Sequence, residues 1–228
     1  MRLSIIVPVL NEAGTIAAVL QDLARLRTRG VEIVVVDGGS QDRTAALAEA
    51  AADRVLVAAR GRASQMNAGA LAATGDALLF LHADTRLPPD ADTLVLRALC
   101  QFVWGRFDVA VEGASGLLPV VSRLMNLRSR LTGIATGDQA IFVRRDVFCR
   151  VRGFRDIPLM EDIVLSRDLK RLGRPACLRA RVVTSGRRWD RHGALRTILL
   201  MWRLRLAFYL GADPHHLAAA YGYRPRDA

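Results

Sequence analysis

The chain has 228 residues, of which 51% are hydrophobic, and a formal net charge of +11. This length suits one α/β domain, and the hydrophobic content excludes wholesale disorder. Every basic residue except Lys170 is an arginine, so the charge reflects a compositional bias as much as a basic patch, and no aromatic-rich basic stretch indicates RNA binding.

The cysteine spacing and the N-terminal segment indicate the cellular compartment of the protein. The three cysteines lie far apart, which predicts reduced thiols in a cytosolic protein. Pro8, Asn11 and Glu12 interrupt the first apolar run, which therefore reads as a strand rather than a signal peptide. No uncharged window reaches the ~20 residues of a membrane span. We expect a cytoplasmic protein.

The first half of the chain alternates between apolar runs and helix-like stretches. Runs rich in Val, Ile and Leu predict strands over residues 3–9, 31–36, 54–58 and 76–81. Helix-like stretches lie between them, over residues 13–28, 42–52 and 63–73. This alternation indicates a parallel sheet that is buried on both faces and has right-handed crossovers.

The second half has a more mixed pattern. Residues 102–113 partly alternate, with Phe107, Val109 and Val111 on one face. Further elements are predicted as a helix over 117–131, a strand over 139–143, a helix over 161–172 and a strand over 176–184. We expect this half to supply antiparallel edges to one continuous domain, with no linker or internal repeat.

Two carboxylates are expected at strand tips. Asp37 ends the run 31–36, and Asp84 ends the run 77–83. In open α/β sheets, ligands bind beyond the carboxyl ends of the strands. Asp84 is an oxygen ligand suited to Mg²⁺ or Mn²⁺, which would also take diphosphate oxygens. The pair predicts a site for a sugar nucleotide and a metal, although turn formation or helix capping would also explain both acids.

Polar residues after the other strands add to this site. Asn11 and Glu12 follow the first strand and could reach a nucleoside, although Asn11 also suits a helix cap. Arg62 lies at a helix N-terminus, which favours an anion such as diphosphate, unless the loop is merely exposed. Gln65 and Asn67 are poor choices for a helix core, which favours ligand contacts.

In this order, the motifs resemble those of a family 2 glycosyltransferase with the GT-A fold. The resemblance covers roughly residues 1–190 and rests on segments 5–12, 36–44, 70–76, 82–84, 161–162 and 188–189. It implies a mixed, mainly parallel sheet flanked by helices. It also implies inverting transfer of a sugar from a nucleoside-diphosphate sugar to an acceptor hydroxyl.

A compact bacterial subgroup linked to arsenosugar biosynthesis is especially similar. The shared segments are 61–63, 65–67, 79–85, 137–142 and 158–162. His82 stands where many family members have aspartate, which implies a weaker or different metal site. The surroundings of Arg187 lack the glutamine-containing form of the family's Arg-Trp motif, so we do not expect processive polymer synthesis.

The resemblance implies roles for individual residues. Asp84 matches the last acid of the metal motif, and Asp162, beside Glu161, matches the general base. Asp37 resembles the nucleotide-binding acid, and Arg188 with Trp189 resembles the pair near the acceptor and diphosphate. The expected donor contacts are Pro8, Asn11, Glu12, Asp37, Arg62, Gln65, Asn67, Asp84, Arg188 and Trp189.

A C-terminal helical extension, residues 193–228, is expected to follow the domain formed by residues 1–192. Leu195 to Leu210 is apolar at helical spacing and basic elsewhere. Its apolar face could pack on the core, form a homodimer contact, or lie peripherally at the inner face of the cell membrane.

Two other functions remain open at this point. One is nucleotidyl transfer on a similar sheet. The other is a basic protein that binds nucleic acid or an anionic membrane surface. The paired strand-tip acids disfavour nucleic acid, because they repel phosphate unless a metal intervenes.

Overall fold

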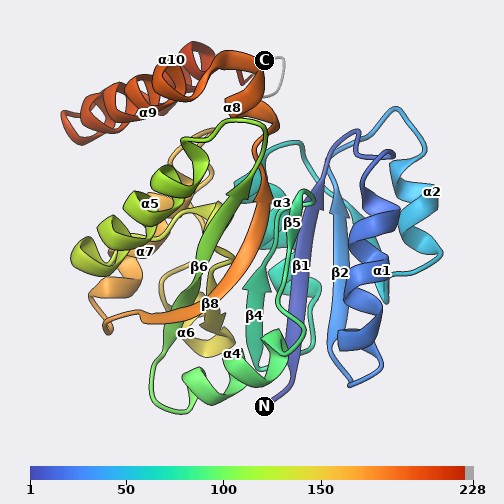
Figure 1. Ribbon diagram of the computed structural model, residues 1–228. Coiled ribbons are helices and arrows are strands. Elements are labelled where there is room, and N and C mark those ends of the chain that lie inside the picture. The colour runs from blue at the N-terminus through green and yellow to red at the C-terminus, as the bar shows by residue number, and fades with distance from the viewer. Residues whose placement is uncertain (224–228) are drawn as a thin grey trace.

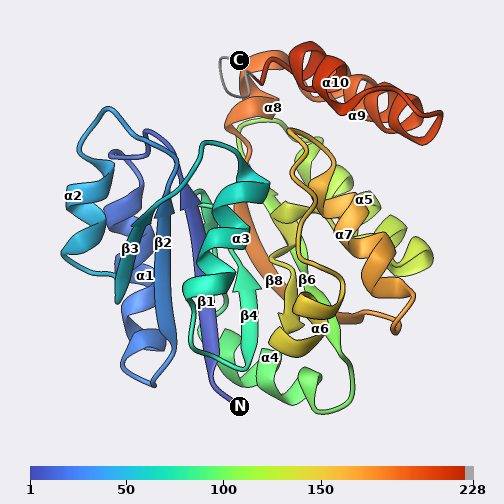
Figure 2. The ribbon, with the colours of Figure 1, turned by 180° about the vertical axis from the view of Figure 1, so that it is seen from behind.

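The computed structural model describes residues 1–223 and has one sheet with helices on both faces (Figures 1 and 2). The strands lie in the order β3-β2-β1-β4-β7-β6-β8-β5. Their bounds are Leu3–Val9 (β1), Glu32–Asp37 (β2), Arg54–Val57 (β3), Ala77–Phe80 (β4), Thr85–Arg86 (β5), Trp104–Glu112 (β6), Phe142–Arg144 (β7) and Ala176–Ser185 (β8). The predicted α/β class is confirmed.

The first four strands form the parallel half of the sheet. β1 pairs with β2 and β4, and β2 pairs with β3, all in parallel. β2 and β4 are buried along their whole length, which explains their uninterrupted apolar sequences. The chain builds outward on one side of β1 and then returns to its other side with β4, so a topological switch point lies beside β1.

The remaining strands are mixed in direction, as the sequence predicts. β7 runs antiparallel to both β4 and β6, and β5 runs antiparallel to β8. β6 and β8 are parallel, with an irregularity in register between Phe107 and Asp108. Phe107, Val109 and Val111 all pack in one core cluster, so the predicted common face is confirmed.

Helices cover the two faces of the sheet in separate groups. The helix bounds are Ile16–Arg27 (α1), Thr44–Glu49 (α2), Arg62–Ala72 (α3), Ala91–Leu99 (α4), Leu118–Thr132 (α5), Arg145–Arg150 (α6), Glu161–Lys170 (α7), Arg187–His192 (α8), Ala194–Tyr209 (α9) and Pro214–Tyr221 (α10). Residues of α1, α2, α4 and α5 pack in one core cluster, and residues of α3, α6 and α7 pack in the other. Helices α4, α6 and α8 were not predicted from the sequence, whereas α9 and α10 lie within the expected helical extension, residues 193–228.

The C-terminal helices α9 and α10 lie across the carboxyl end of the sheet (Figure 1). Leu204 of α9 and Leu217 of α10 pack with Met160 in a small third cluster. Much of α9 is nevertheless exposed, including the side chains of Leu195, Leu199, Trp202, Leu206 and Tyr209. Among the described residues, the structure contains no helix with the length and apolar character needed to cross a membrane.

Candidate active site

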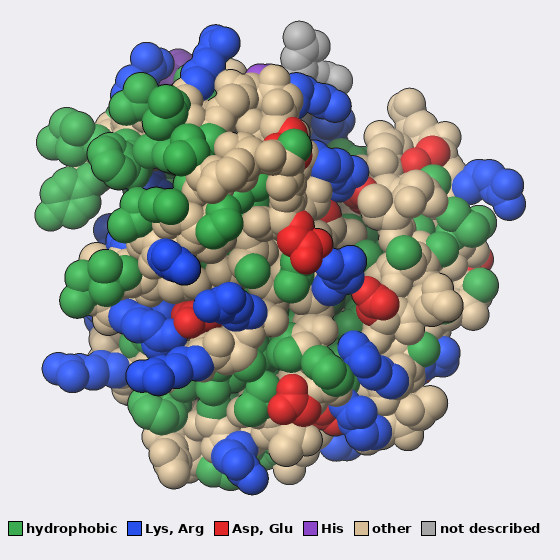
Figure 3. Space-filling model, in the orientation of Figure 1, with side chains coloured by type: hydrophobic (Ala, Val, Ile, Leu, Met, Phe, Trp, Pro, Cys, Tyr) green, Lys and Arg blue, Asp and Glu red, His purple; other side chains and the backbone are tan. Residues whose placement is uncertain are grey.

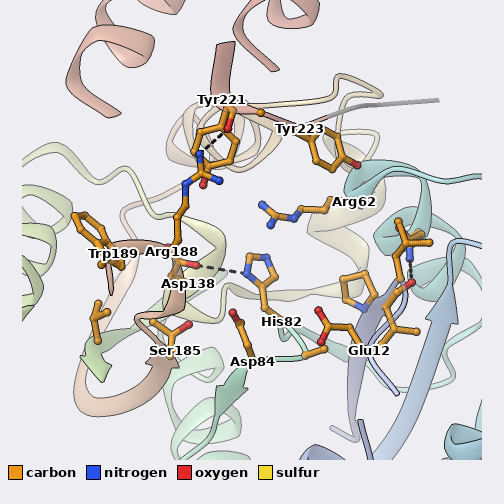
Figure 4. A pocket seen from close by; sticks show the side chains of 18 of the residues that line it. Glu12, Arg62, His82, Asp84, Asp138, Ser185, Arg188, Trp189, Tyr221 and Tyr223 are labelled. Atoms are coloured by element: carbon orange, nitrogen blue, oxygen red, sulfur yellow. Dashed lines mark hydrogen bonds and ion pairs between the residues drawn. The ribbon is translucent and has the colours of Figure 1, made fainter. Parts of the chain in front are cut away.

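A pocket of about 380 Å³ opens at the carboxyl ends of the strands (Figure 4). Its floor comes from residues at the ends of β1, β4 and β8, and its roof comes from the C-terminal end of α10. The predicted residues that line it are Pro8, Glu12, Arg62, Gln65, Asp84, Arg188 and Trp189. The fold therefore gathers seven predicted site residues around one cavity.

Asp84 lies four residues beyond β4, with its carboxylate turned toward the pocket (Figure 4). The loop is held from below, because the Ser185 N–H donates to the Asp84 carbonyl at 3.1 Å. The carboxylate itself accepts a long bond of 3.4 Å from the Thr85 hydroxyl. Arg187 Nη2 lies 3.9 Å from Asp84 and 4.0 Å from the carboxylate of Glu12, so one arginine faces both acids.

The residues around Asp84 fit a divalent cation that is completed by a ligand. Among residues 1–223, no group of three or more His, Cys, Asp and Glu side chains is placed to hold a metal alone. Mg²⁺ is usually bound through one or two carboxylates together with substrate phosphates and water. Asp84 offers one such carboxylate, 34% exposed and weakly engaged by the protein.

Arginines supply positive charge above the acids. The side chain of Arg62 extends from the start of α3 into the pocket (Figure 4). Desolvation opposes its charge, but the acidic groups around it, Glu161 foremost, together outweigh this effect and raise the pKa of Arg62. Arg188 donates from Nη2 to the Tyr221 carbonyl at 2.5 Å, and its guanidinium carbon lies 3.6 Å from the Tyr221 ring centroid. Both cations suit an anionic ligand.

Gln65 braces the pocket floor. Its Nε2 donates to the carbonyls of Val9 and Val36, each at 2.8 Å, and so ties the ends of β1 and β2 together. A Cβ on Gly38 would lie 3.0 Å from the Gln65 amide, so glycine permits this close approach. The side chain is 4% exposed, and its polar atoms mainly serve the backbone.

Three predicted donor contacts do not line this pocket. Asp37 accepts from the Ser40 N–H and hydroxyl, which closes the Gly-rich turn after β2. Asn11 Oδ1 accepts from the Gln41 N–H at 2.8 Å. Asn67 bonds the N–H and carbonyl of Phe154 at 2.9 and 2.8 Å. Each of these three side chains therefore binds protein groups in the described structure. Their contact with a donor substrate stays a prediction.

Glu161 and Asp162 open helix α7 beside the pocket, against a small cavity that they line together with His82 and Gly137. Burial, reinforced by the charge of Asp162, raises the pKa of Glu161 to about 7, although Arg62 opposes the shift. Burial likewise raises the pKa of Asp162. Asp162 is oriented by two backbone donors, the N–H of Gly137 at 2.9 Å and that of Ile163 at 2.7 Å.

His82 and Asp138 connect the strand tip to this acid pair. His82 Nδ1 lies 3.5 Å from Asp138 Oδ1 (Figure 4). A Cβ on Gly137 would overlap the His82 ring, so the glycine lets the loop pack against it. Partial desolvation opposes the charge of Asp138, whose side chain is half exposed, but His82, Arg62 and Arg128 together lower its pKa. The ring of His82 therefore faces this loop, which carries a donor to Asp162.

Sequence reasoning missed several pocket residues. Asp138 lies in a segment that resembles the bacterial subgroup, yet that resemblance assigned it no role. Tyr221 and Tyr223 line the roof, and neither belongs to a recognisable motif. Their placement depends on how α9 and α10 fold back over the sheet.

The fold has the architecture of GT-A glycosyltransferases, as solved structures show. The mannosyltransferase PcManGT from Pyrobaculum calidifontis, solved with GDP-Man and Mn²⁺, aligns with a TM-score of 0.65 at 21% identity and covers 97% of this chain and 69% of that one. TarS 1–349 of S. aureus, solved with UDP, aligns with a TM-score of 0.66 at 19% identity over 81% of this chain and 60% of that one. The predicted GT-A fold is confirmed.

Sequence comparison identifies the family. The model of Glycosyl transferase family 2 matches residues 4–146, more than half of the chain, and the chain therefore belongs to this family. An undecaprenyl-phosphate 4-deoxy-4-formamido-L-arabinose transferase of Pseudomonas paraeruginosa is 34% identical over 156 residues, 62% of this chain and 45% of that protein.

A second curated relative matches a shorter stretch. The PGL/p-HBAD biosynthesis glycosyltransferase of Mycobacterium tuberculosis is 42% identical over 98 residues, which is 40% of this chain and 38% of that protein. The chain thus spans less than half the length of both relatives.

Proposed function

We propose that this protein is an inverting, metal-assisted glycosyltransferase that moves a sugar from a nucleoside-diphosphate sugar to an acceptor hydroxyl. The observation that carries the proposal is the weakly engaged Asp84 carboxylate, which faces a pocket that also holds Arg62 and Arg188. Membership of family 2 supports glycosyl transfer. Structural neighbours solved with UDP-GlcNAc, or with GDP-Man and Mn²⁺, support the donor class and a divalent cation.

Asp84 would hold Mg²⁺ or Mn²⁺, whose other ligands would come from the donor diphosphate and water. When bound, the cation would neutralise charge that develops on the leaving nucleoside diphosphate. Arg62 and Arg188 would act on the same charge from the opposite wall. Pro8, Glu12 and Trp189 would shape the donor site around them.

The transfer itself is a direct displacement. The acceptor oxygen attacks the anomeric carbon, the bond from that carbon to the diphosphate oxygen breaks, and its electron pair leaves with the diphosphate. Asp162 accepts the hydroxyl proton. Attack from the face opposite the leaving group inverts the anomeric centre. Holding both substrates in line supplies much of the acceleration.

The surroundings of Asp162 suit a base. Its raised pKa makes the carboxylate a stronger base than an ordinary aspartate, and the N–H groups of Gly137 and Ile163 fix its orientation. Burial raises the pKa of both acids, so the choice between them rests on orientation: Asp162 is fixed by the Gly137 N–H from the facing loop. We therefore assign proton transfer to Asp162 and an electrostatic role to Glu161.

Product analysis tests this function against nucleotidyl transfer. With a sugar nucleotide, Mn²⁺ and acceptor, glycosyl transfer releases nucleoside diphosphate, whereas nucleotidyl transfer releases pyrophosphate. Phosphorus NMR of the reaction distinguishes these products. Accumulation of pyrophosphate would replace the present proposal with the alternative one.

We further propose that the protein belongs to the bacterial subgroup linked to arsenosugar biosynthesis. We also propose that it acts in the cytoplasm or at the inner face of the cell membrane. Exposed apolar residues on α9 support a peripheral contact or a homodimer. A basic protein for nucleic acid would instead show steeply salt-dependent DNA affinity and no sugar-nucleotide binding.

A further inference from the structure

An apolar groove of about 500 Å³ runs between α5 and α9. Figure 3 shows hydrophobic side chains gathered at the upper left of the molecule, where Figure 1 places these two helices. The groove adjoins the candidate active site, because Met125, Asp138 and Trp189 line both cavities. A molecule in the groove could therefore extend directly into the catalytic pocket.

Helical spacing builds the groove from two facing stripes. Val121, Leu124 and Arg128 share one side of α5, and Ile198, Met201 and Arg205 share one side of α9. Leu124 remains 54% exposed, which leaves a large apolar side chain in contact with water. A hydrocarbon chain between the stripes would remove this apolar surface from water, which is favourable.

Arg128 lies where the groove meets the catalytic acids. Its Nε and Nη2 atoms are buried, and neither has a hydrogen-bond partner among the described residues. Desolvation lowers the pKa of Arg128, against the opposing charges of Asp162 and Asp138. Two buried donors without partners are unfavourable, and an anionic group in the groove that drew the half-buried guanidinium toward it would pair with both.

We propose that the acceptor is an anionic amphiphile, whose hydrocarbon chain occupies the groove between α5 and α9 and whose anionic group pairs with Arg128. This inference rests on the proposed glycosyl transfer, because it names the substrate class of the same site. The hydrocarbon chain of the acceptor lies against Val121, Leu124, Ile198 and Met201. Its anionic head group turns toward Asp162. Arg205 on the groove wall adds a second cation that suits the same head group.

The test uses amphiphiles of known chemistry on the whole protein. Dodecyl phosphate, held below its critical micelle concentration, is titrated by calorimetry, with dodecyl maltoside and inorganic phosphate as matched probes for the chain and the anion. Dodecyl phosphate should bind at least tenfold more tightly than either. Equal affinity for the neutral and anionic detergents would overturn the role of the anion.

Matched variants locate the site. Arg128→Met should weaken dodecyl phosphate at least tenfold and leave dodecyl maltoside unchanged, while Arg123→Met, an exposed arginine on the same helix, should change neither. Ile198→Glu should abolish binding of both detergents, and Leu199→Glu, which alters an exposed neighbour outside the groove, should not. Unchanged binding in both Arg128→Met and Ile198→Glu would refute the proposal.

Two further measurements separate this inference from its rivals. Titration of UDP and GDP with Mn²⁺ into each variant reports on the donor site independently. Loss of donor binding with intact amphiphile binding would contradict the proposed glycosyl transfer, but not the binding of an amphiphile in the groove. Mass measurement in solution addresses a second copy as the occupant. A dimer that dissociates in Ile198→Glu and does not bind dodecyl phosphate would overturn the proposal in favour of self-association.

Discussion

The guanidinium carbon of Arg188 lies 3.6 Å above the ring centroid of Tyr221, and the same arginine donates to the Tyr221 carbonyl. These contacts join α8, just after the last strand, to the end of α10. They fix the roof of the pocket over Asp84 and Glu12 (Figure 4). The C-terminal helices are therefore part of the candidate active site as well as a surface element.

The Arg188–Tyr221 contact predicts an effect on donor binding. Tyr221→Ala removes the ring but keeps the backbone carbonyl, so it removes a stacking contact worth ~0.5–2 kcal/mol. Affinity for a nucleoside diphosphate should fall about 2- to 30-fold. Tyr221→Phe keeps the ring and should bind nearly as the native protein does. Calorimetry measures both, and a loss in Tyr221→Phe equal to that in Tyr221→Ala would contradict stacking.

Replacement of the proposed base should separate binding from transfer. Asp162→Asn should retain donor affinity and lose turnover by roughly 10²–10⁴-fold, the range for general-base catalysis. Glu161→Gln should have a milder effect, because its charge acts on Asp162 rather than on the substrate proton. Single-turnover assays with the native acceptor class check the order of the two variants. The reverse order would assign the base to Glu161.

Burial of Glu161 predicts an unusual dependence of stability on pH. Its pKa rises from 4.5 to about 7 on folding, so between these values the folded state binds more protons than the unfolded state. The free energy of unfolding should therefore fall as pH rises from about 4.5 to about 7, by on the order of 3 kcal/mol, and stay reduced above that range.

Glu161→Gln should remove the part of this dependence that Glu161 supplies and leave the part due to Asp162, whose pKa is also raised. The variant should be more stable than the native protein at pH 8 and similar to it at pH 4.5, as measured by urea unfolding. Glu49→Gln, at an exposed position in α2, provides the control and should change neither value. A pH dependence of stability in Glu161→Gln equal to that of the native protein would show that Glu161 is not held in its protonated form.

The strand tips and the parallel sheet could be predicted from sequence because local patterns determine them. The apolar runs that form β1, β2 and β4 have the length and composition of buried parallel strands, and Asp84 follows one of them. The helix α10 also had a local signal, since Asp213 caps it at the His215 N–H and Pro214 starts it. The sequence predicted one helical extension over residues 193–228, without the break between α9 and α10.

Other features depend on contacts between distant segments. The Asn67 amide bonds Phe154, 87 residues later, so its poor fit to a helix core has a structural explanation that sequence alone does not reveal. Asp37 was correctly expected at a strand tip, but the turn formed by its own neighbours engages its carboxylate. The stripes of α5 and α9 become a groove only when the two helices face each other.

The central claim is that Asp84 joins a divalent cation to the donor diphosphate, and titration calorimetry of UDP and GDP tests it most directly. Native protein should bind one of these nucleotides at least tenfold more tightly with Mn²⁺ than without it. Asp84→Asn should lose this gain and keep its metal-free affinity, while Asp90→Asn, at an exposed position outside the pocket, should behave as native. An undiminished Mn²⁺ gain in Asp84→Asn would contradict the account.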